Sequence, residues 1–205
     1  MSRITKHALI VGHPNADSFT QSAARVYQQS VEALGHTVLV RDLYGMNFDP
    51  RLQFEEIPRQ TGFAPGDDIV AERALIADAN VFTFFYPLWF NVPPAIITGY
   101  VQRVLSMGFG YGPVRNGANQ RLLLGRSMLS FSSSGAPAEW LRSEGGWDAL
   151  TNLFDDHVAE VCGMSVLDHR HFGRVLNATP ACRIDAHFKE VRDTVAKHFG
   201  SANAR

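Results

Sequence analysis

The chain of 205 residues is 45% hydrophobic and 19% charged, which is sufficient for one well-packed core and predicts a single domain over residues 1–205. Its 19 basic and 20 acidic residues give a formal net charge of −1, without the basic excess expected of a nucleic-acid-binding protein. The apolar stretches are too short for an integral membrane segment or a signal peptide, so we expect a cytoplasmic protein in which Cys162 and Cys182 are free thiols.

Apolar runs of strand length alternate with segments of helical spacing along the whole chain. In chain order the predicted elements are strand 7–13, helix 18–34, strand 37–43, helix 67–79, strand 80–86, helix 93–107, strand 127–135, helix 148–162, strand 164–172 and helix 183–199. Residues 44–66 contain three prolines and three glycines without a clear period, which predicts a long surface excursion. The glycine-rich residues 108–120 predict a second loop.

Five strands that alternate with helices indicate an α/β fold with a parallel sheet and helices on both faces. Right-handed crossovers favour the doubly wound strand order 2-1-3-4-5. In such sheets ligands bind outside the carboxyl ends of the strands, near the point where the strand order reverses. The loops that follow the first, third and fourth strands are therefore the candidate site.

The first of these loops, residues 12–20, offers His13, Asn15, Ser18 and Thr20 at the start of a helix. Free backbone N–H groups and the helix dipole favour an anion there, which suits a phosphate group. The alternative is that Asp17 or Ser18 only caps the helix. Capping explains Ser18 and leaves His13 unexplained.

The loop at residues 87–91 offers flat apolar groups, Trp89 and Phe90, stiffened by prolines on both sides. The alternative reading is an aromatic plug over the end of the sheet. The loop at residues 132–137 offers three hydroxyl groups and Gly135, whose backbone can approach a ring edge closely. Together the three loops indicate a site for a nucleotide with a large planar ring.

Several common catalytic patterns are absent from the sequence. It contains no Walker A pattern and no nucleophile elbow, and the spaced glycines of residues 108–112 follow a helix rather than open one. The eight histidines show no zinc-ligand spacing, so we predict no metal site. His169 and His171 alternate on a predicted strand, where solvent-facing or hydrogen-bonded side chains are the simplest interpretation.

Five stretches in order resemble the NAD(P)H:quinone oxidoreductases of the flavodoxin-like fold and the related potassium-efflux ancillary quinone reductases. They are "GHPNADSFT", "DLYGMNFDP", "DDIVAERALIADANVFTFFYPLWF", "GYVQRVLSMGFGYG" and "CGMSVL", and they extend from residue 7 to about residue 170. The resemblance implies a flavodoxin-like fold and a homodimer that binds a flavin, FAD with FMN as the alternative.

The resemblance also implies the roles of individual residues. The flavin-binding residues it implies are His13, Ser18, Phe19, Pro87, Leu88, Trp89, Phe90, Asn91, Ser132, Ser133, Ser134 and Gly135. Tyr111, in the stretch Phe109–Gly110–Tyr111, would reach toward the partner's substrate pocket. NAD(P)H would pass a hydride to the flavin N5, and a quinone would then receive two electrons at the same site by a ping-pong mechanism. No side chain is assigned a catalytic role, because the flavin carries the chemistry.

The sequence departs from the family pattern after the serine loop. Trp140 stands where the family often places a tyrosine, and a histidine position falls near Gly146, so Trp140 is expected to form a wall of the substrate pocket. Two alternatives share the fold. One is a flavodoxin-type electron carrier, against which the net charge of −1 argues. The other is a regulatory flavoprotein subunit of a membrane transporter.

Overall fold

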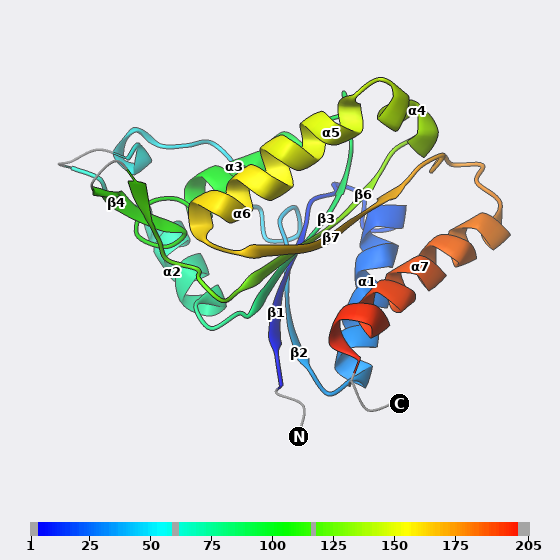
Figure 1. Cartoon of the computed structure of the whole chain (residues 1–205), viewed down its shortest axis with the longest axis horizontal. Helices are drawn as coiled ribbons and strands as arrows, with labels where there is room; N and C mark the ends of the chain where they lie inside the picture. The colour runs from blue at the N-terminus through cyan, green and yellow to red at the C-terminus, as the bar shows by residue number, and fades with distance from the viewer. Residues whose placement is uncertain (1–3, 59–61, 116–117, 201–205) are drawn as a thin grey trace.

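The computed structural model describes residues 4–58, 62–115 and 118–200. A five-stranded parallel sheet runs through the centre of the molecule, in the order β2-β1-β3-β6-β7 (Figure 1). Its strands are β1 (Lys6–Val11), β2 (Thr37–Asp42), β3 (Val81–Pro87), β6 (Ser127–Ser133) and β7 (Ser165–Phe172). Counted among themselves, these strands have the predicted order 2-1-3-4-5, so the doubly wound fold is confirmed.

Helices cover both faces of this sheet. Helices α1 (Phe19–Ala33) and α7 (Ala181–Phe199) pack together on one face (Figure 1). The opposite face carries α2 (Asp67–Ile76), α3 (Ala95–Val104) and a continuous helical stretch made of α5 (Gly146–Leu150), the π-helical segment η2 (Thr151–Asp156) and α6 (His157–Cys162). Each face therefore has its own hydrophobic core.

Strand β3 shows why the central strands read as continuous apolar runs. All seven of its residues are buried, since helices cover both faces of the sheet. Successive side chains point to opposite faces, so Phe84 packs beneath η2 whereas Phe85 packs against α1. Because side chains alternate between the two faces of the sheet, one apolar run contributes residues to both hydrophobic cores.

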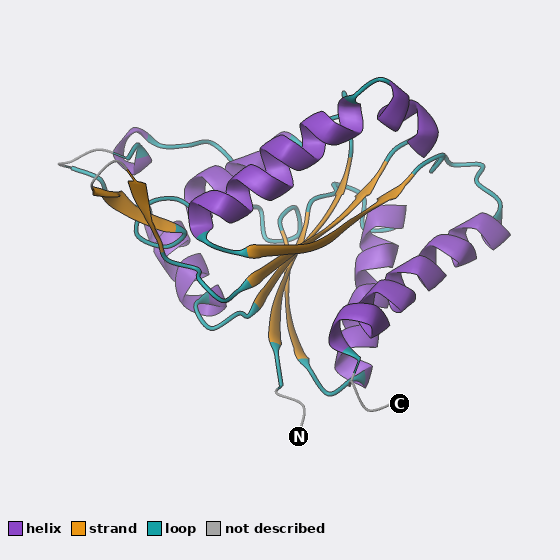
Figure 2. Ribbon diagram, viewed as in Figure 1, coloured by secondary structure: helices purple, strands orange, loops and turns teal. Residues whose placement is uncertain are grey.

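Two segments differ from the prediction. The glycine-rich residues 108–120 were expected to be loop, but they include β4 (Tyr111–Arg115), which pairs with β5 (Ala118–Arg121) in an antiparallel hairpin. Residues 116 and 117, within the expected loop, lie outside the described residues. Figure 2 shows this hairpin set apart from the five-stranded sheet. The short helix α4 (Ala138–Ser143) and the start of α5 also fall where only a loop was expected.

The excursion at residues 44–66 is largely irregular in its described residues and includes one short helix, η1 (Phe54–Glu56). Residues 59–61 of this expected excursion lie outside the described residues. Cys162 is buried and Cys182 is exposed, and both are free thiols as expected. Across the described ranges, the combination of length and apolar character that a membrane-spanning helix needs is not found.

Candidate cofactor site

A cavity of about 660 Å³ opens at the carboxyl ends of the strands. It is lined by His13, Asn15, Asp17, Ser18, Phe19, Thr20, Ser22, Pro87, Leu88, Trp89, Ser133, Ser134, Gly135, Val175, Leu176, Asn177, Thr179, Ile184 and Phe188. The three loops expected to form a site therefore meet at one cavity, together with the connection from β7 to α7. We call it the strand-end cavity.

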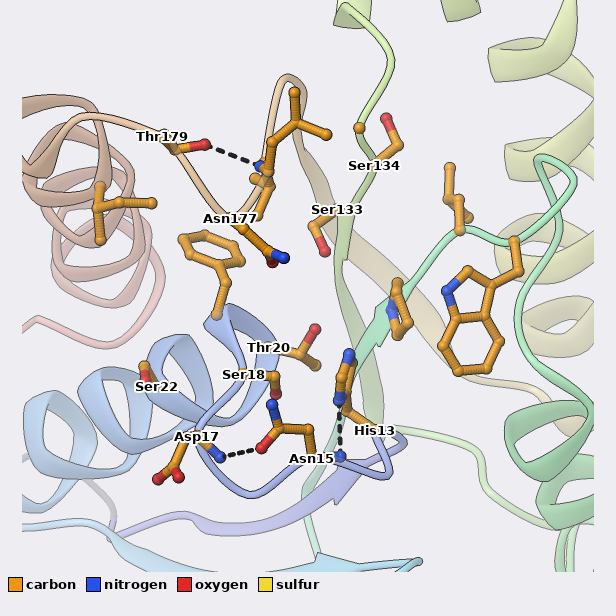
Figure 3. Close-up of a pocket in the computed structure, with 18 of the residues that line it drawn as sticks. His13, Asn15, Asp17, Ser18, Thr20, Ser22, Ser133, Ser134, Asn177 and Thr179 are labelled. Carbon is orange, nitrogen blue, oxygen red and sulfur yellow. Dashed lines mark hydrogen bonds between the residues drawn. The ribbon is translucent and has the colours of Figure 1, made fainter.

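The N-terminus of α1 forms one end of the strand-end cavity (Figure 3). Ser18 is the N-cap residue, and its hydroxyl accepts a hydrogen bond from the Gln21 amide at 3.2 Å. The capping role considered from the sequence is thus present. The first amides of a helix have no acceptor within it, so those of Phe19 and Thr20 remain available to an anion in the cavity. The described residues that line the cavity include one carboxylate, Asp17, and no Lys or Arg.

His13 adds a hydrogen-bond donor at the same end. Its Nδ1 accepts the Asn15 amide proton at 3.0 Å, so the proton of the neutral ring sits on Nε2 (Figure 3). The pKa of His13 is lowered from its ordinary value chiefly by burial. A neutral ring with Nε2–H can donate to a ligand oxygen without carrying charge.

The apolar wall of the cavity is formed by Pro87, Leu88 and Trp89 at the end of β3. The Leu88 amide donates to the Ser133 carbonyl at 2.6 Å, which ties this wall to the serine loop. Trp89 is 44% exposed and its ring centroid lies 6.0 Å from that of His13. Such a half-exposed indole is available to pack against a planar ligand.

The next two residues do not join this wall. Trp89 and Val92 exchange backbone hydrogen bonds of 3.2 Å, and between them Phe90 and Asn91 have φ values of 54° and 60°. These are the features of a type I′ turn, which turns the chain back on itself. The Phe90 side chain is fully exposed, and Asn91 lies beside Gly146. Neither of these two expected flavin contacts lines the cavity within one chain.

The serine loop contributes Ser133, Ser134 and Gly135 to the cavity, whereas Ser132 is buried and does not line it. Successive strand residues point to opposite faces, so Ser132 faces the core beneath η2. There its hydroxyl meets the rings of His169 and His171 at 2.7 and 2.9 Å. From the sequence, these two histidines were expected to be either solvent-facing or hydrogen-bonded. They are hydrogen-bonded.

The two residues expected to contact substrate also lie away from the strand-end cavity. Tyr111 lines a second, mainly apolar cavity of about 510 Å³ between α3 and α6. Burial is the main cause of its raised pKa. Trp140 lies on α4 and is 45% exposed. Within a single chain, neither side chain forms a wall of the strand-end cavity.

The connection after β7 is the part of the site that the sequence analysis missed. Thr179 accepts the Leu176 amide at 2.8 Å, and its hydroxyl donates to the Arg174 carbonyl at 3.0 Å, which fixes a compact loop. Figure 3 shows the Asn177 side chain directed across the cavity toward Ser133. The sequence signal that could have identified this loop was its position, because it also follows the carboxyl end of a parallel strand.

A family model described as having a flavodoxin-like fold matches residues 5–195. The chain belongs to this family. It is 34% identical over 170 residues to a Haemophilus influenzae protein named an uncharacterized NAD(P)H oxidoreductase, covering 82% of this chain and 84% of that protein. It is 30% identical to the ribosyldihydronicotinamide dehydrogenase [quinone] of Mus musculus, with 68% of each chain covered.

Solved structures agree with this flavodoxin-like assignment. The NAD(P)H:quinone oxidoreductase from Methanothermobacter marburgensis superposes with a TM-score of 0.84 at 23% identity, over 96% of this chain and 98% of that one. An FMN-dependent NADH-azoreductase from Bacillus anthracis, in complex with FMN, gives a TM-score of 0.69 at 18% identity, over 95% and 99% of the chains. At these identities the solved structures show the fold. Together with the family model and the Haemophilus influenzae relative, they confirm the family expected from the sequence.

Proposed function

We propose that the protein is a flavin-dependent NAD(P)H:quinone oxidoreductase that works as a homodimer. The observation that carries this proposal is the strand-end cavity, which has a helix N-terminus at one end and the apolar wall Pro87–Trp89 at another part of its lining. A phosphate and a planar ring need these two environments in one site. The name of the Haemophilus influenzae relative supports an enzyme that oxidises NAD(P)H, and that of the mouse relative, a ribosyldihydronicotinamide dehydrogenase [quinone], supports a quinone acceptor.

The residues present fit a flavin. The amides of Phe19 and Thr20, with the Nε2–H of His13, would hold its phosphate, and Trp89 would pack against its ring. Bound there, the flavin would supply two-electron chemistry, taking a hydride from NAD(P)H at N5 and passing it to a quinone. FAD remains the expected form and FMN the alternative, and the mass of the small molecule that purifies with the protein decides between them.

The chain's own contribution is to bind and orient the reacting groups. Pro87 and the type I′ turn fix the direction of Trp89, so little side-chain freedom is lost when a ring packs against it. The bond between the Leu88 amide and the Ser133 carbonyl holds the apolar wall against the serine loop. NAD(P)H and the acceptor would occupy the same open side of the ring in turn.

The test compares two neighbouring aromatic residues. Trp89→Ala removes a ring that lines the cavity, whereas Phe90→Ala, the control, removes one that does not. We expect Trp89→Ala to weaken flavin retention about 10–100-fold and Phe90→Ala to weaken it far less, because the Phe90 ring does not line the cavity of its own chain. The measurements are flavin dissociation and NAD(P)H oxidation with a quinone acceptor. Equal retention by Trp89→Ala and the unmodified protein would contradict the proposed ring site, and flavin without NAD(P)H oxidation would favour an electron carrier.

A further inference from the structure

A continuous chain of hydrogen bonds leads from the core beneath η2 to the rim of the strand-end cavity. Its members come from η2, β7, β6 and the loop after β6, and are joined side chain to side chain. In order from the core they are Asp155, His169, Ser132, His171 and Ser134, at successive donor–acceptor distances of 2.6, 2.7, 2.9 and 3.0 Å. We call these five residues the polar chain. Ser134 belongs to the cavity lining, so the chain ends at the candidate site.

The geometry of two neighbouring parallel strands builds the polar chain. Ser132 of β6 lies in register with His171 of β7, and His169 lies in register with Ser130. Alternate residues of a strand share one face, so a row of serines on β6 faces a row of histidines on β7. Asp155 enters from η2, a π-helical segment of a kind that occurs frequently at functional sites.

When Asp155 is ionised, counting the protons assigns a donor and an acceptor to every hydrogen bond of the polar chain, and all the bonds then point the same way. Asp155 then accepts from His169 Nδ1–H, which leaves His169 Nε2 to accept the Ser132 hydroxyl proton. The Ser132 oxygen in turn accepts from His171 Nδ1–H. His171 Nε2 is then bare and accepts the hydroxyl proton of Ser134. Every hydrogen bond points inward from the cavity.

A second direction is also available, because Ser134 has another acceptor. Its hydroxyl lies 3.1 Å from the Ala136 carbonyl, and a serine has one proton to donate. When that proton turns to Ala136, His171 must donate from Nε2. The reversal then passes along the polar chain and places an additional proton between His169 and Asp155. The two directions therefore differ by one proton at the buried end.

The surroundings keep His171 neutral and the inner end of the polar chain dry. Burial lowers the pKa of His171 to about 4, and His169, Arg142 and His187 add to the shift. The ring of Trp147 lies over both histidines, with centroid distances of 4.8 Å to His169 and 6.1 Å to His171. Asp155 and the His169 side chain are 1% and 3% exposed. Protons therefore reach this pair more easily along the polar chain than directly from solvent.

We propose that the polar chain is a proton relay, which holds one proton at the Asp155–His169 pair and delivers it to the strand-end cavity through Ser134. The use of this proton rests on the proposed function. Reduction of a quinone to a hydroquinone takes two electrons and two protons. A hydride supplies both electrons and one proton, so one further proton must reach the cavity.

The delivery step balances along the polar chain. Ser134 gives its hydroxyl proton to the acceptor and takes the Nε2 proton of His171. Ser132 passes its proton to Nδ1 of His171 and takes the Nε2 proton of His169. Asp155 gives its proton to Nδ1 of His169 and is left ionised. Five protons each move across one hydrogen bond, one proton leaves, and the chain ends in its inward direction. Water in the open cavity supplies the next proton by the reverse path.

Histidine tautomers provide a test that does not depend on turnover. Heteronuclear NMR of the purified full-length protein, with and without added flavin, distinguishes Nδ1–H from Nε2–H on each ring. We expect His169 and His171 to change tautomer together, since the Ser132 hydroxyl links the two rings and one cannot reverse without the other. Ser132→Ala should separate the two rings, and Ser132→Thr, which keeps the hydroxyl, should join them again. Ser130→Ala is the matched control, because Ser130 is equally buried and bonds Asp155 but lies off the path.

Kinetics test whether the reaction uses the relay. Ser132→Ala should slow quinone reduction about 10²-fold and change its solvent deuterium isotope effect, with both restored in Ser132→Thr. Independent tautomer changes of the two rings in the unmodified protein, or coupled changes that survive Ser132→Ala, overturn the relay. Unchanged quinone reduction and isotope effect in Ser132→Ala overturn its use in the reaction. If the two rings are coupled but the protein neither binds flavin nor oxidises NAD(P)H, the relay stands and the proposed function is wrong.

Discussion

Arg103 on α3 and Glu56 on η1 form a buried, two-pronged ion pair. Their Nε–Oε2 and Nη2–Oε1 distances are 2.8 and 2.7 Å, and each side chain is 3% exposed. Arg103 also donates to the Asp49 carbonyl at 2.6 Å and to the partly exposed Asp68 carboxylate. One guanidinium group therefore attaches the irregular excursion at residues 44–66 to α2 and α3.

Breaking this pair should be strongly destabilising. Arg103→Ala leaves the Glu56 carboxylate buried without its partner, so we expect a loss of about 3–5 kcal/mol in the free energy of unfolding. The control is Arg51→Ala, which breaks the exposed pair with Asp49 and should change the free energy of unfolding far less. Urea unfolding measures both. Similar midpoints for the two variants would show that the buried pair does not anchor the excursion.

A second prediction concerns acid stability and His7. This side chain is fully buried, with Nδ1 2.7 Å from the Tyr27 hydroxyl and Nε2 2.9 Å from the Thr5 hydroxyl. Burial, with a smaller contribution from His36, lowers its pKa to about 4. Between this value and the unfolded value of about 6.5 the unfolded chain binds more protons. Stability should therefore fall as the pH drops from about 6.5 to about 4.

The full contribution of His7 across that window is on the order of 3 kcal/mol, and His171 adds to it in the same direction. His7→Gln should flatten the dependence of the urea midpoint on pH, although it also lowers stability at neutral pH. His157→Gln changes an exposed histidine and serves as the control. A pH dependence that is equally steep in His7→Gln and in the control would contradict this assignment.

Backbone strain at Phe90 leads to a third prediction. A bulky residue at a φ of 54° is unfavourable, and the exposed side chain gains no packing within the chain to offset it. Asparagine tolerates this conformation and is preferred in type I′ turns. Phe90→Asn should therefore raise the free energy of unfolding by about 1 kcal/mol, whereas Asn91→Val should lower it. Thermal unfolding of flavin-free protein measures both, and a destabilised Phe90→Asn would mean that Phe90 has stabilising contacts in solution.

The sequence predicted the features that depend on local pattern and topology. Buried runs such as β3 and the alternation of strands and helices were sufficient for the sheet order, and that order placed Ser18, Trp89 and Ser133 at one cavity. The hairpin β4–β5 was missed because glycines weaken the strand pattern of residues 108–120. The loop around Asn177 was missed because it follows an edge strand, away from the point where the strand order reverses.

Features that depend on side-chain direction could not be predicted in the same way. Ser132 was grouped with Ser133 and Ser134 as one loop, yet the strand continues through Ser133 and turns Ser132 into the core. Its contact with His171 depends on the register between β6 and β7, which neither segment specifies alone. Likewise, nothing in the sequence around Phe90 indicates the positive φ that turns its ring away from the cavity.

The proposed homodimer leads to the last prediction. Trp89, Phe90 and Trp140 are 44%, 102% and 45% exposed, and exposed aromatic side chains of this kind mark interaction surfaces. Tyr111 does not line the strand-end cavity of its own chain. In a two-fold dimer each contact occurs twice, so each cavity could be completed by Tyr111 from the other subunit.

Complementation tests this arrangement. One chain carries Trp89→Ala with Phe90→Ala and keeps Tyr111, while the other carries Tyr111→Ala and keeps both aromatic residues. If Tyr111 crosses to the partner, a mixed dimer contains one intact site, formed by the second chain's Trp89 and the first chain's Tyr111. After subunit exchange of an equal mixture, half of the dimers are mixed, so we expect roughly a quarter of the parental quinone reductase activity. If Tyr111 serves its own subunit, both sites of the mixed dimer are defective and mixing produces no gain. Full activity in a species that sediments as a monomer would equally rule out a shared site.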